Sequence, residues 1–239
     1  MDNQLLQLTE STWLFPHHPN FRRVQASIGV VTSGDETLLV DAGNGPATAK
    51  HVKKAIQDVN LPEVTQIVYT HHHWDHVYGA CEFDVSVVAH QCCREILLEE
   101  SKKPWSLDYL REVIRKEPKL RVSFKAKERA VKNWDRFRIV VPEIIFTKSK
   151  RLRVGKVDVL LEHVGGDHAD DSIVVKVPDE GVIFLGDCYY IPPLHLREPT
   201  STISRAMLTS LADQNYSLYV EGHDAPYTRA ELLEFLEGE

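Results

Sequence analysis

The stretch Thr70-His71-His72-His73-Trp74-Asp75-His76 carries four histidines and one aspartate, and all but His72 belong to the pattern HxHxDH. The residues before it are mostly apolar and β-rich, which predicts a buried strand. The pattern therefore follows the carboxyl end of a strand, where α/β sheets place their binding sites. Because such a loop can turn alternate side chains inward, His71 and His73 can meet at one metal ion. Asp75 and His76 would then point to a second ion beside it.

The ligand types narrow the choice of metal. Neutral imidazole suits zinc, copper, iron or nickel, and a carboxylate adds oxygen character, so zinc is the first choice and manganese and iron stay open. The competing interpretations are a surface histidine cluster and a purification tag. A tag would lie at a terminus and would not follow a buried strand, so a metal site explains the pattern better.

Length and composition favour a globular enzyme-sized domain. The chain has 239 residues, of which 43% are hydrophobic and 26% charged, which predicts a single domain over residues 1–239 with a sizeable core. The first six residues have no positive segment and no long apolar run, so we expect neither a secretory signal nor a membrane partner. The four cysteines show no zinc-finger spacing and no disulfide framework, which favours a reducing, cytoplasmic location: Cys81, Cys92, Cys93 and Cys188.

Charge is distributed unevenly along the chain. The net charge is −7, yet residues 101–153 contain 17 Lys and Arg against 6 Asp and Glu. This basic block could attract an anionic substrate or a phosphate backbone. It could equally face the acidic remainder of the chain or a second copy in a homo-oligomer.

The hydrophobic pattern predicts strands near both ends and helices in the middle. We expect a helix from Pro46 to about Val59 and a helical stretch from Gln91 to Lys116 with a break at Pro104. Residues 117–137 fit either more helix or an ordered loop. Strands are expected in two short runs within 5–15 and at 24–32, 37–43, 65–69, 85–89, 139–141, 144–146, 157–164, 173–177, 182–185 and 218–220. Further helices are expected at 203–211 and 230–236. The result is an α/β sandwich with a helical, basic insertion at about 91–150.

Three further strand ends supply additional ligands. His168 lies in a loop whose glycines allow close backbone approach, and it can be a third nitrogen ligand. Asp187 follows Gly186 at the end of another strand and can bridge two cations. His223 follows a third strand end.

In their order along the chain, these motifs resemble the metallo-β-lactamase fold superfamily of hydrolases. The resemblance covers nearly the whole chain, from the strand that ends in Asp41-Ala42-Gly43 to Gly222-His223. It implies a four-layer αββα sandwich with two metal ions at the sheet edges. It also implies the ligand sets: His71, His73 and His168 for the first ion, Asp75, His76 and His223 for the second, and Asp187 as the bridge.

The loop that carries His168 departs from the common pattern of the superfamily. It has Gly-Asp-His-Ala-Asp-Asp-Ser in place of Gly-His-Thr-Pro-Gly-Ser, and it is similar to the corresponding region of the antibiotic-hydrolysing lactamases. Some of those enzymes use a cysteine ligand where others use aspartate. We favour Asp187 over the adjacent Cys188, because Asp187 directly follows Gly186 and a carboxylate can bridge. Cys188 is then a packed thiol.

The other polar residues near the motifs receive supporting or ordinary roles. Asp41 is expected to support the metal loop by hydrogen bonding. His72 points away from the ligands and is expected to be structural. His51, His90 and His163 are interpreted as ordinary helix or strand residues. The loop histidines could line the mouth of a substrate site: His17, His18 and His195.

The ligand set predicts metal-assisted hydrolysis. Two cations close together lower the pKa of a shared water and give hydroxide at neutral pH, while one of them polarises the scissile bond. Asp75 and Asp187 could orient the hydroxide. Tyr190 stands at the same offset from Asp187 as a tyrosine of the acyl-homoserine lactonases, so it could hydrogen-bond the substrate carbonyl or donate a proton.

The expected substrate is a small ester, lactone or thioester. The basic insertion could act as a cap that attracts anionic acyl substrates, such as coenzyme A or glutathione esters. The main alternative is a phosphodiesterase or ribonuclease, although only Phe124, Trp134 and Phe137 supply aromatic side chains in the basic stretch 117–137. A β-lactamase, a non-catalytic metal-binding sensor and the iron-dependent oxygenases of the superfamily are less favoured.

Overall fold

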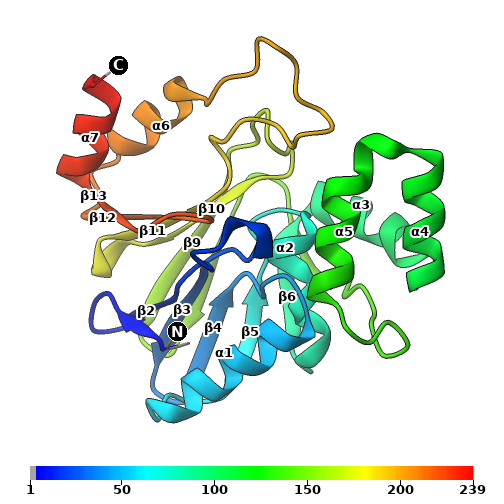
Figure 1. Ribbon diagram of the computed structural model, residues 1–239. Coiled ribbons are helices and arrows are strands. Elements are labelled where there is room, and N and C mark those ends of the chain that lie inside the picture. Colours follow the sequence, from blue (N-terminus) through cyan, green and yellow to red (C-terminus); the bar gives the residue numbers. More distant parts are fainter. Residues whose placement is uncertain (1–3, 239) are drawn as a thin grey trace.

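Two β-sheets lie face to face in the computed structural model, which describes residues 4–238 (Figure 1). The first sheet has the strand order β1-β2-β3-β4-β5-β6-β7. The strands β1 to β4 are antiparallel neighbours, and β4 to β7 run parallel to one another. Their bounds are Leu6–Gln7, Thr12–Phe15, Ile28–Ser33, Glu36–Val40, Val64–Val68, Ser86–His90 and Ile144–Phe146.

The second sheet has the strand order β13-β12-β11-β10-β9-β8. It is antiparallel except for the parallel pair β11 and β12. Its strands, from β8 to β13, are Ser149–Val154, Val157–His163, Ile173–Val177, Val182–Gly186, Leu218–Glu221 and Tyr227–Thr228.

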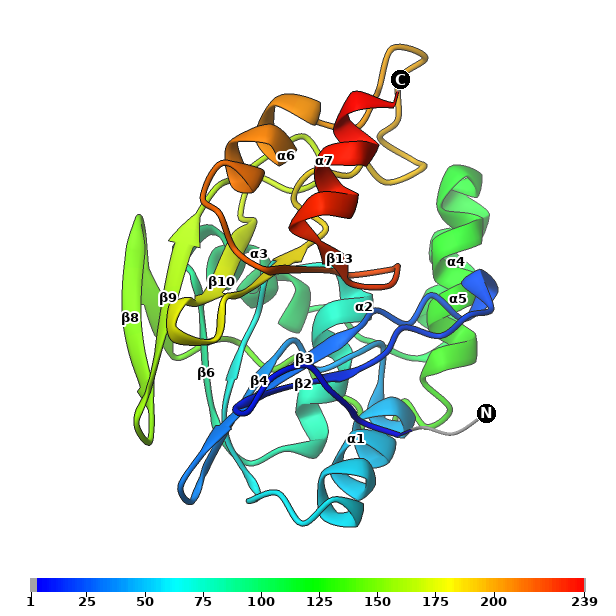
Figure 2. The same cartoon turned by 90° about the vertical axis from the view of Figure 1, so that its left-hand side faces the viewer.

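Helices cover the outer face of each sheet, as Figures 1 and 2 show from two sides. Helix α1 (Pro46–Asp58) lies on the first sheet, and α6 (Arg205–Ala212) and α7 (Arg229–Glu237) lie on the second. The other helices are α2 (Trp74–Val77), α3 (Gln91–Ser101), α4 (Leu107–Lys116) and α5 (Arg121–Ala130). Short 3₁₀ turns occupy Phe21–Arg23 (η1), Tyr78–Glu82 (η2), Pro118–Leu120 (η3) and Pro178–Glu180 (η4). The predicted four-layer αββα sandwich is thereby confirmed.

Alternation along the strands divides the core into layers. Leu38 and Val40 point between the sheets, while Leu39 between them packs toward α1. In the second sheet, Val175 joins the layer between the sheets and Val174 packs toward α6 and α7. Because each fully buried aliphatic side chain contributes about 1.5–3 kcal/mol, these layers fix the register of the strands and hence the position of their ends.

The insertion folds into three helices that we call the cap: α3, α4 and α5. The predicted break at Pro104 is confirmed, since α3 ends at Ser101 and α4 begins at Leu107. Residues 117–137, which the sequence left open between helix and ordered loop, contain η3 and α5. The amino group of Lys127 on α5 lies 5.1 Å from the ring centre of Trp105 and 5.7 Å from that of Tyr78. Because Tyr78 directly follows α2 of the metal loop, this aromatic cluster attaches the cap to the loop.

The structure corrects the predicted strands in three ways. Residues 139–141 form no strand. Ile139 and Val140 pack against the core cluster that includes residues of the cap, and the following Pro142 lacks the N–H group that a strand pair would use. Strand β8 was missed because three of its six residues are basic, a composition that an exposed edge strand tolerates. Two strands have other bounds than predicted: the one predicted at 24–32 begins only at Ile28, and the one predicted at 37–43 ends at Val40. Residues 1–3, at the start of the segment in which no secretory signal is expected, lie outside the described residues. No helix within residues 4–238 is long and apolar enough to cross a membrane.

Helix α7 offers a test of the outer layer. The Thr228 hydroxyl accepts a hydrogen bond from the Glu231 N–H at 3.3 Å, and the Glu231 carboxylate accepts one from the Thr228 N–H at 2.8 Å. Thr228→Ala should lower the free energy of unfolding by about 1 kcal/mol and the melting temperature by about 2–4 °C. Thr228→Ser keeps the hydroxyl that accepts from the Glu231 N–H, so this variant should melt like the parent in calorimetry. Equal melting temperatures for the two variants would contradict this role.

Candidate metal centre

The predicted ligands meet where strands of both sheets end. Parallel pairing brings the carboxyl ends of β4 and β5 together in the first sheet, and those of β11 and β12 together in the second. The HxHxDH loop follows β5, Asp187 follows β11 and His223 is the second residue after β12. His168 comes from the loop between β9 and β10. A hydrogen bond from Ile173 N–H to Thr70 O, 2.9 Å long, connects the two sheet edges at this point.

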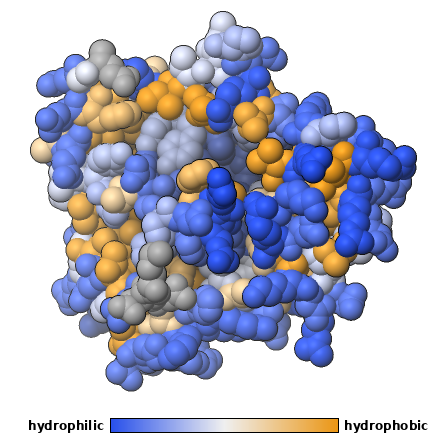
Figure 3. All heavy atoms as spheres, in the orientation of Figure 1, coloured by the Kyte–Doolittle hydropathy of each residue, from blue (hydrophilic) through white to orange (hydrophobic). Residues whose placement is uncertain are grey.

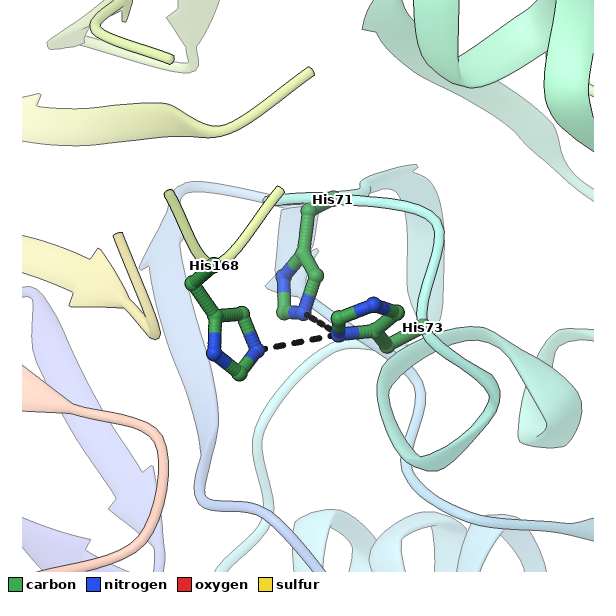
Figure 4. A group of neighbouring side chains, drawn as sticks. All are labelled: His71, His73 and His168. Atoms are coloured by element: carbon green, nitrogen blue, oxygen red, sulfur yellow. Dashed lines mark hydrogen bonds between the residues drawn. The ribbon is translucent and has the colours of Figure 1, made fainter. Parts of the chain in front are cut away.

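The first group consists of His71, His73 and His168 (Figure 4). His73 Nδ1 lies 2.9 Å from His71 Nε2 and 3.0 Å from His168 Nε2, so three ring nitrogens converge on one point. Burial, followed by the neighbouring His72, lowers the pKa of His73 to about 3. Burial also places the pKa of His71 well below its usual value. These rings are therefore neutral, which is the state in which imidazole binds a metal.

The second group consists of Asp75, His76 and His223. Asp75 Oδ2 lies 3.1 Å from His223 Nε2 and 3.8 Å from His76 Nε2. Burial opposes protonation of His223, but the carboxylates of Asp187 and Asp75 outweigh it and raise the pKa of His223 to about 10. The pocket therefore favours positive charge at this group, which either protons or a metal ion can supply.

Asp187 lies between the two groups. Its Oδ2 is 3.4 Å from His168 Nε2 of the first group, and 3.4 Å and 3.3 Å from the Nε2 atoms of His76 and His223 of the second. Burial would raise the pKa of Asp187, but His223 and His76 hold it well below its usual value. The side chain is thus an ionised carboxylate in the position that a bridging ligand would occupy.

Contacts behind the rings leave the converging nitrogens with free lone pairs. Asp41 accepts hydrogen bonds from Thr70 N–H at 2.7 Å, from the Thr70 hydroxyl at 2.8 Å and from His76 Nδ1 at 2.7 Å. The Thr70 oxygen can in turn accept from His71 Nδ1 at 3.0 Å, and Ile191 O accepts from His168 Nδ1 at 2.9 Å. With Nδ1 protonated, Nε2 of His71, His76 and His168 is left as the ligand atom, whereas His73 turns its Nδ1 toward the group. The predicted supporting role of Asp41 is confirmed.

The glycine before His223 is required by close packing. A Cβ atom at Gly222 would lie 2.0 Å from Asp187 Oδ1. Any side chain there would displace the carboxylate that lies between the two groups. The Gly-His pair after β12 is therefore part of the site's geometry.

The residues present fit two divalent cations. Within residues 4–238, the buried His76 Nε2 and Asp187 Oδ1 have no hydrogen-bond partner, although such buried polar atoms are normally paired. The two groups together offer imidazole nitrogens and carboxylate oxygens, a mixed set that suits zinc, manganese or iron. None of the groups found in the described residues includes Cys188, whose thiol packs in the core under α6. Coordination by the named residues stays a prediction.

The centre opens into a cavity of about 510 Å³ between the cap and the loop after β11. Figure 3 shows hydrophobic side chains beside this hollow. The walls are mostly apolar, and they include two basic side chains, Lys119 and Arg197, and the imidazole of His195. Tyr190 also lines the cavity, and its hydroxyl oxygen accepts a hydrogen bond from His223 N–H at 3.2 Å. Burial and then Asp187 raise the pKa of Tyr190, so its hydroxyl stays protonated.

The expectation that the loop histidines line the mouth of a substrate site is met in part, since only one of the three lines the cavity at the candidate metal centre. His195 lines this cavity, and His17 and His18 line a neighbouring hollow. His72 binds Asp171 at 2.8 Å. His90 stacks on His163 with ring centres 3.8 Å apart.

Sequence inspection missed four residues that shape the site: Lys119, Arg197, Val24 and Asn44. Lys119 and Arg197 meet at the cavity only through the fold, and no local spacing connects them. Asn44, which follows Asp41-Ala42-Gly43 beyond the end of β4, did carry a sequence signal. It is a polar residue two positions before Pro46, the first residue of helix α1, and the structure buries it.

Comparisons with known proteins agree with this geometry. A family model described as the metallo-beta-lactamase superfamily matches residues 21–223. A metallo-beta-lactamase from Pontibacter korlensis is similar in structure with a TM-score of 0.63 and 16% identity, over 98% of this chain and 97% of that one. A metallo beta lactamase from Hirschia baltica gives a TM-score of 0.63 and 14% identity, over 98% and 96% of the two chains. At sequence identities this low, the structural similarity shows a shared fold and nothing further. No curated protein matches the chain.

Proposed function

This chain belongs to the metallo-beta-lactamase superfamily, and we propose that it is a metal-dependent hydrolase with a binuclear centre. One observation carries the proposal. The Asp187 carboxylate lies within 3.4 Å of a nitrogen from each of the two ligand groups, which is the geometry that a shared ligand needs. His71, His73 and His168 would hold one ion, and the other would be held by Asp75, His76 and His223.

Two divalent cations there would acidify a water molecule and polarise the bond to be cleaved. The chain's own residues supply the remaining functions. Asp75, whose pKa is lowered despite burial by its hydrogen bond to His223, is an ionised acceptor that can orient the attacking water. The protonated hydroxyl of Tyr190 can donate a hydrogen bond to the substrate carbonyl.

The cavity supports a small carboxylic ester, lactone or thioester as substrate. Its apolar walls suit an aliphatic or aromatic group, and at about 510 Å³ it matches the size of small-molecule sites. Lys119 and Arg197 are exposed residues of its lining, so a negatively charged group on the substrate would lie near positive charge. We therefore propose an acyl substrate that carries an anionic group.

A phosphodiester is the second candidate, favoured by the same two basic side chains. A nucleic acid would need an extended basic surface with stacking rings. Here the cap aromatics Trp105, Phe124 and Trp134 are packed together in a cluster instead. Cleavage of a phosphodiester that weakens steeply with salt would favour this candidate over an ester.

Metal removal tests the proposed function. Elemental mass spectrometry of the purified protein should find about two metal ions per chain, since the candidate ligands form three overlapping groups that we assign to two ions sharing Asp187. Chelation should abolish cleavage of at least one substrate class in a panel of esters, thioesters, lactones, a cephalosporin and a phosphodiester. Restoring zinc, manganese or iron should restore it and identify the working metal. A metal-loaded protein that cleaves none of them would overturn the hydrolase and favour a sensor.

A further inference from the structure

A second hollow lies beside the catalytic cavity. It encloses about 310 Å³ and is lined by residues that precede β3, together with His223. Val24 and His223 line both hollows. The candidate ligand His223 is therefore accessible from two sides, and Val24 belongs with it to the boundary that the two hollows share. The rest of the lining is His17, His18, Pro19, Phe21 and Gln25.

Val24 has an unusual backbone for a β-branched residue. Its φ and ψ are 48° and 53°, in the left-handed region that such residues rarely adopt. Asn44 enforces this conformation, because its amide donates hydrogen bonds to Arg23 O at 2.9 Å and Val24 O at 3.1 Å. Asn44 is itself held by the Thr48 hydroxyl, which donates to its side-chain oxygen at 2.7 Å. Strain of this kind concentrates at functional sites.

The two hollows differ in chemistry. The first has basic residues in its lining, whereas the second, as far as residues 4–238 are described, is lined by no Lys, Arg, Asp or Glu. His18 Nδ1 accepts a hydrogen bond from Asn20 N–H at 3.0 Å, which leaves its Nε2 as a donor. The ring of Phe21 is 82% exposed and offers an open face. The second hollow thus suits an uncharged group with a ring or a hydrogen-bond acceptor.

We propose that the two hollows are the arms of one substrate cleft and that Val24 is the residue that divides them. The inference rests on the proposed hydrolase function and narrows its substrate class. An open-chain ester or thioester would place its anionic acyl group in the first arm and its uncharged alcohol or thiol in the second. Water adds its oxygen to the acyl carbon, the carbon–oxygen or carbon–sulfur bond breaks, and the leaving group departs with a proton from that water. A lactone, whose two parts form one ring, would use only one arm.

The test compares two esters of glutaric acid that differ only in the alcohol, monomethyl and monobenzyl glutarate. The parent should prefer the benzyl ester, and γ-butyrolactone should be a poorer substrate than either. Phe21→Ala, which removes an exposed ring, should reduce the benzyl-to-methyl ratio of kcat/KM about three- to tenfold. Leu98→Ala, an exposed apolar residue on α3, is the matched control and should leave the ratio unchanged. An unchanged ratio in Phe21→Ala, or faster hydrolysis of the lactone, would overturn the two-armed cleft.

Val24→Gly tests the divider itself. Glycine adopts the left-handed conformation without strain, so the variant should melt no lower than the parent while its benzyl-to-methyl ratio falls. A ratio that is unchanged in a stable Val24→Gly protein would overturn the role of Val24.

A binding measurement separates failure of this inference from failure of the proposed function. The half-amide of glutaric acid with benzylamine is the probe, titrated into the parent and Phe21→Ala by calorimetry. Weaker binding to Phe21→Ala supports the second arm even if no ester is cleaved. Equal affinity overturns the second arm even if the protein is an active hydrolase.

Discussion

Asp187→Ala should reduce hydrolysis roughly 10³-fold or more, because it removes the group shared by both ligand sets. Its carboxylate lies 3.3–3.4 Å from the nitrogens of His76, His168 and His223. In the proposed binuclear centre, the ion beside His76 and His223 would lose a charged ligand without Asp187, so metal content should fall below two per chain. Steady-state kinetics and elemental mass spectrometry measure the two effects.

Two further variants separate charge from position. Asp187→Asn keeps the size of the side chain but removes its charge, and it should fall between the parent and Asp187→Ala in metal content. Asp167→Ala removes an exposed carboxylate beside His168 and should change neither quantity. Circular dichroism would establish that each variant is folded. Full activity with two metals in Asp187→Ala would refute the bridging role.

Asp41→Ala should be the most destabilising substitution near the site, at about 3–5 kcal/mol. Asp41 is 2% exposed, and its loss leaves Thr70 N–H, the Thr70 hydroxyl and His76 Nδ1 without their acceptor. Its φ of 69° adds to the cost, since alanine tolerates that region less well than aspartate. Metal affinity should also fall about 10–100-fold, because His76 loses the group that orients it.

Urea unfolding of the metal-free proteins isolates the structural part of this effect. Asp41→Asn is the matched control, since it keeps the volume, tolerates the left-handed backbone and can still accept from Thr70 N–H. Its amide nitrogen would face His76 Nδ1, so we expect an intermediate loss of stability. A loss below 1 kcal/mol in Asp41→Ala would show that the three hydrogen bonds are dispensable.

The features that sequence predicts well here are those that local spacing encodes. The HxHxDH loop, Gly186-Asp187 and Gly222-His223 each follow a β-rich run, so strand ends and ligands could be placed together. Helix α1 was predicted because Pro46 and a 3.6-residue apolar repeat are local signals.

What sequence missed depends on tertiary contacts. Val24 lies in a run that favours a strand, whereas its left-handed conformation is held by hydrogen bonds from Asn44 and by that of its own N–H to Phe21 O. Lys119 and Arg197 come from opposite walls of the cavity and share no motif. Strand β8 was hidden because an exposed edge strand tolerates the basic residues that dominate it.

The distribution of ligands over both sheets has a consequence for the growing polypeptide. The ligands of the HxHxDH loop emerge from the ribosome first. His168 does not emerge until 95 residues after His73. Until β12 has paired with β11, His223 is absent from the group that it completes. A nascent chain therefore holds a partial set of donors for much of its synthesis. If the chain binds metal as proposed, tight capture would follow the joining of both halves and would report that event.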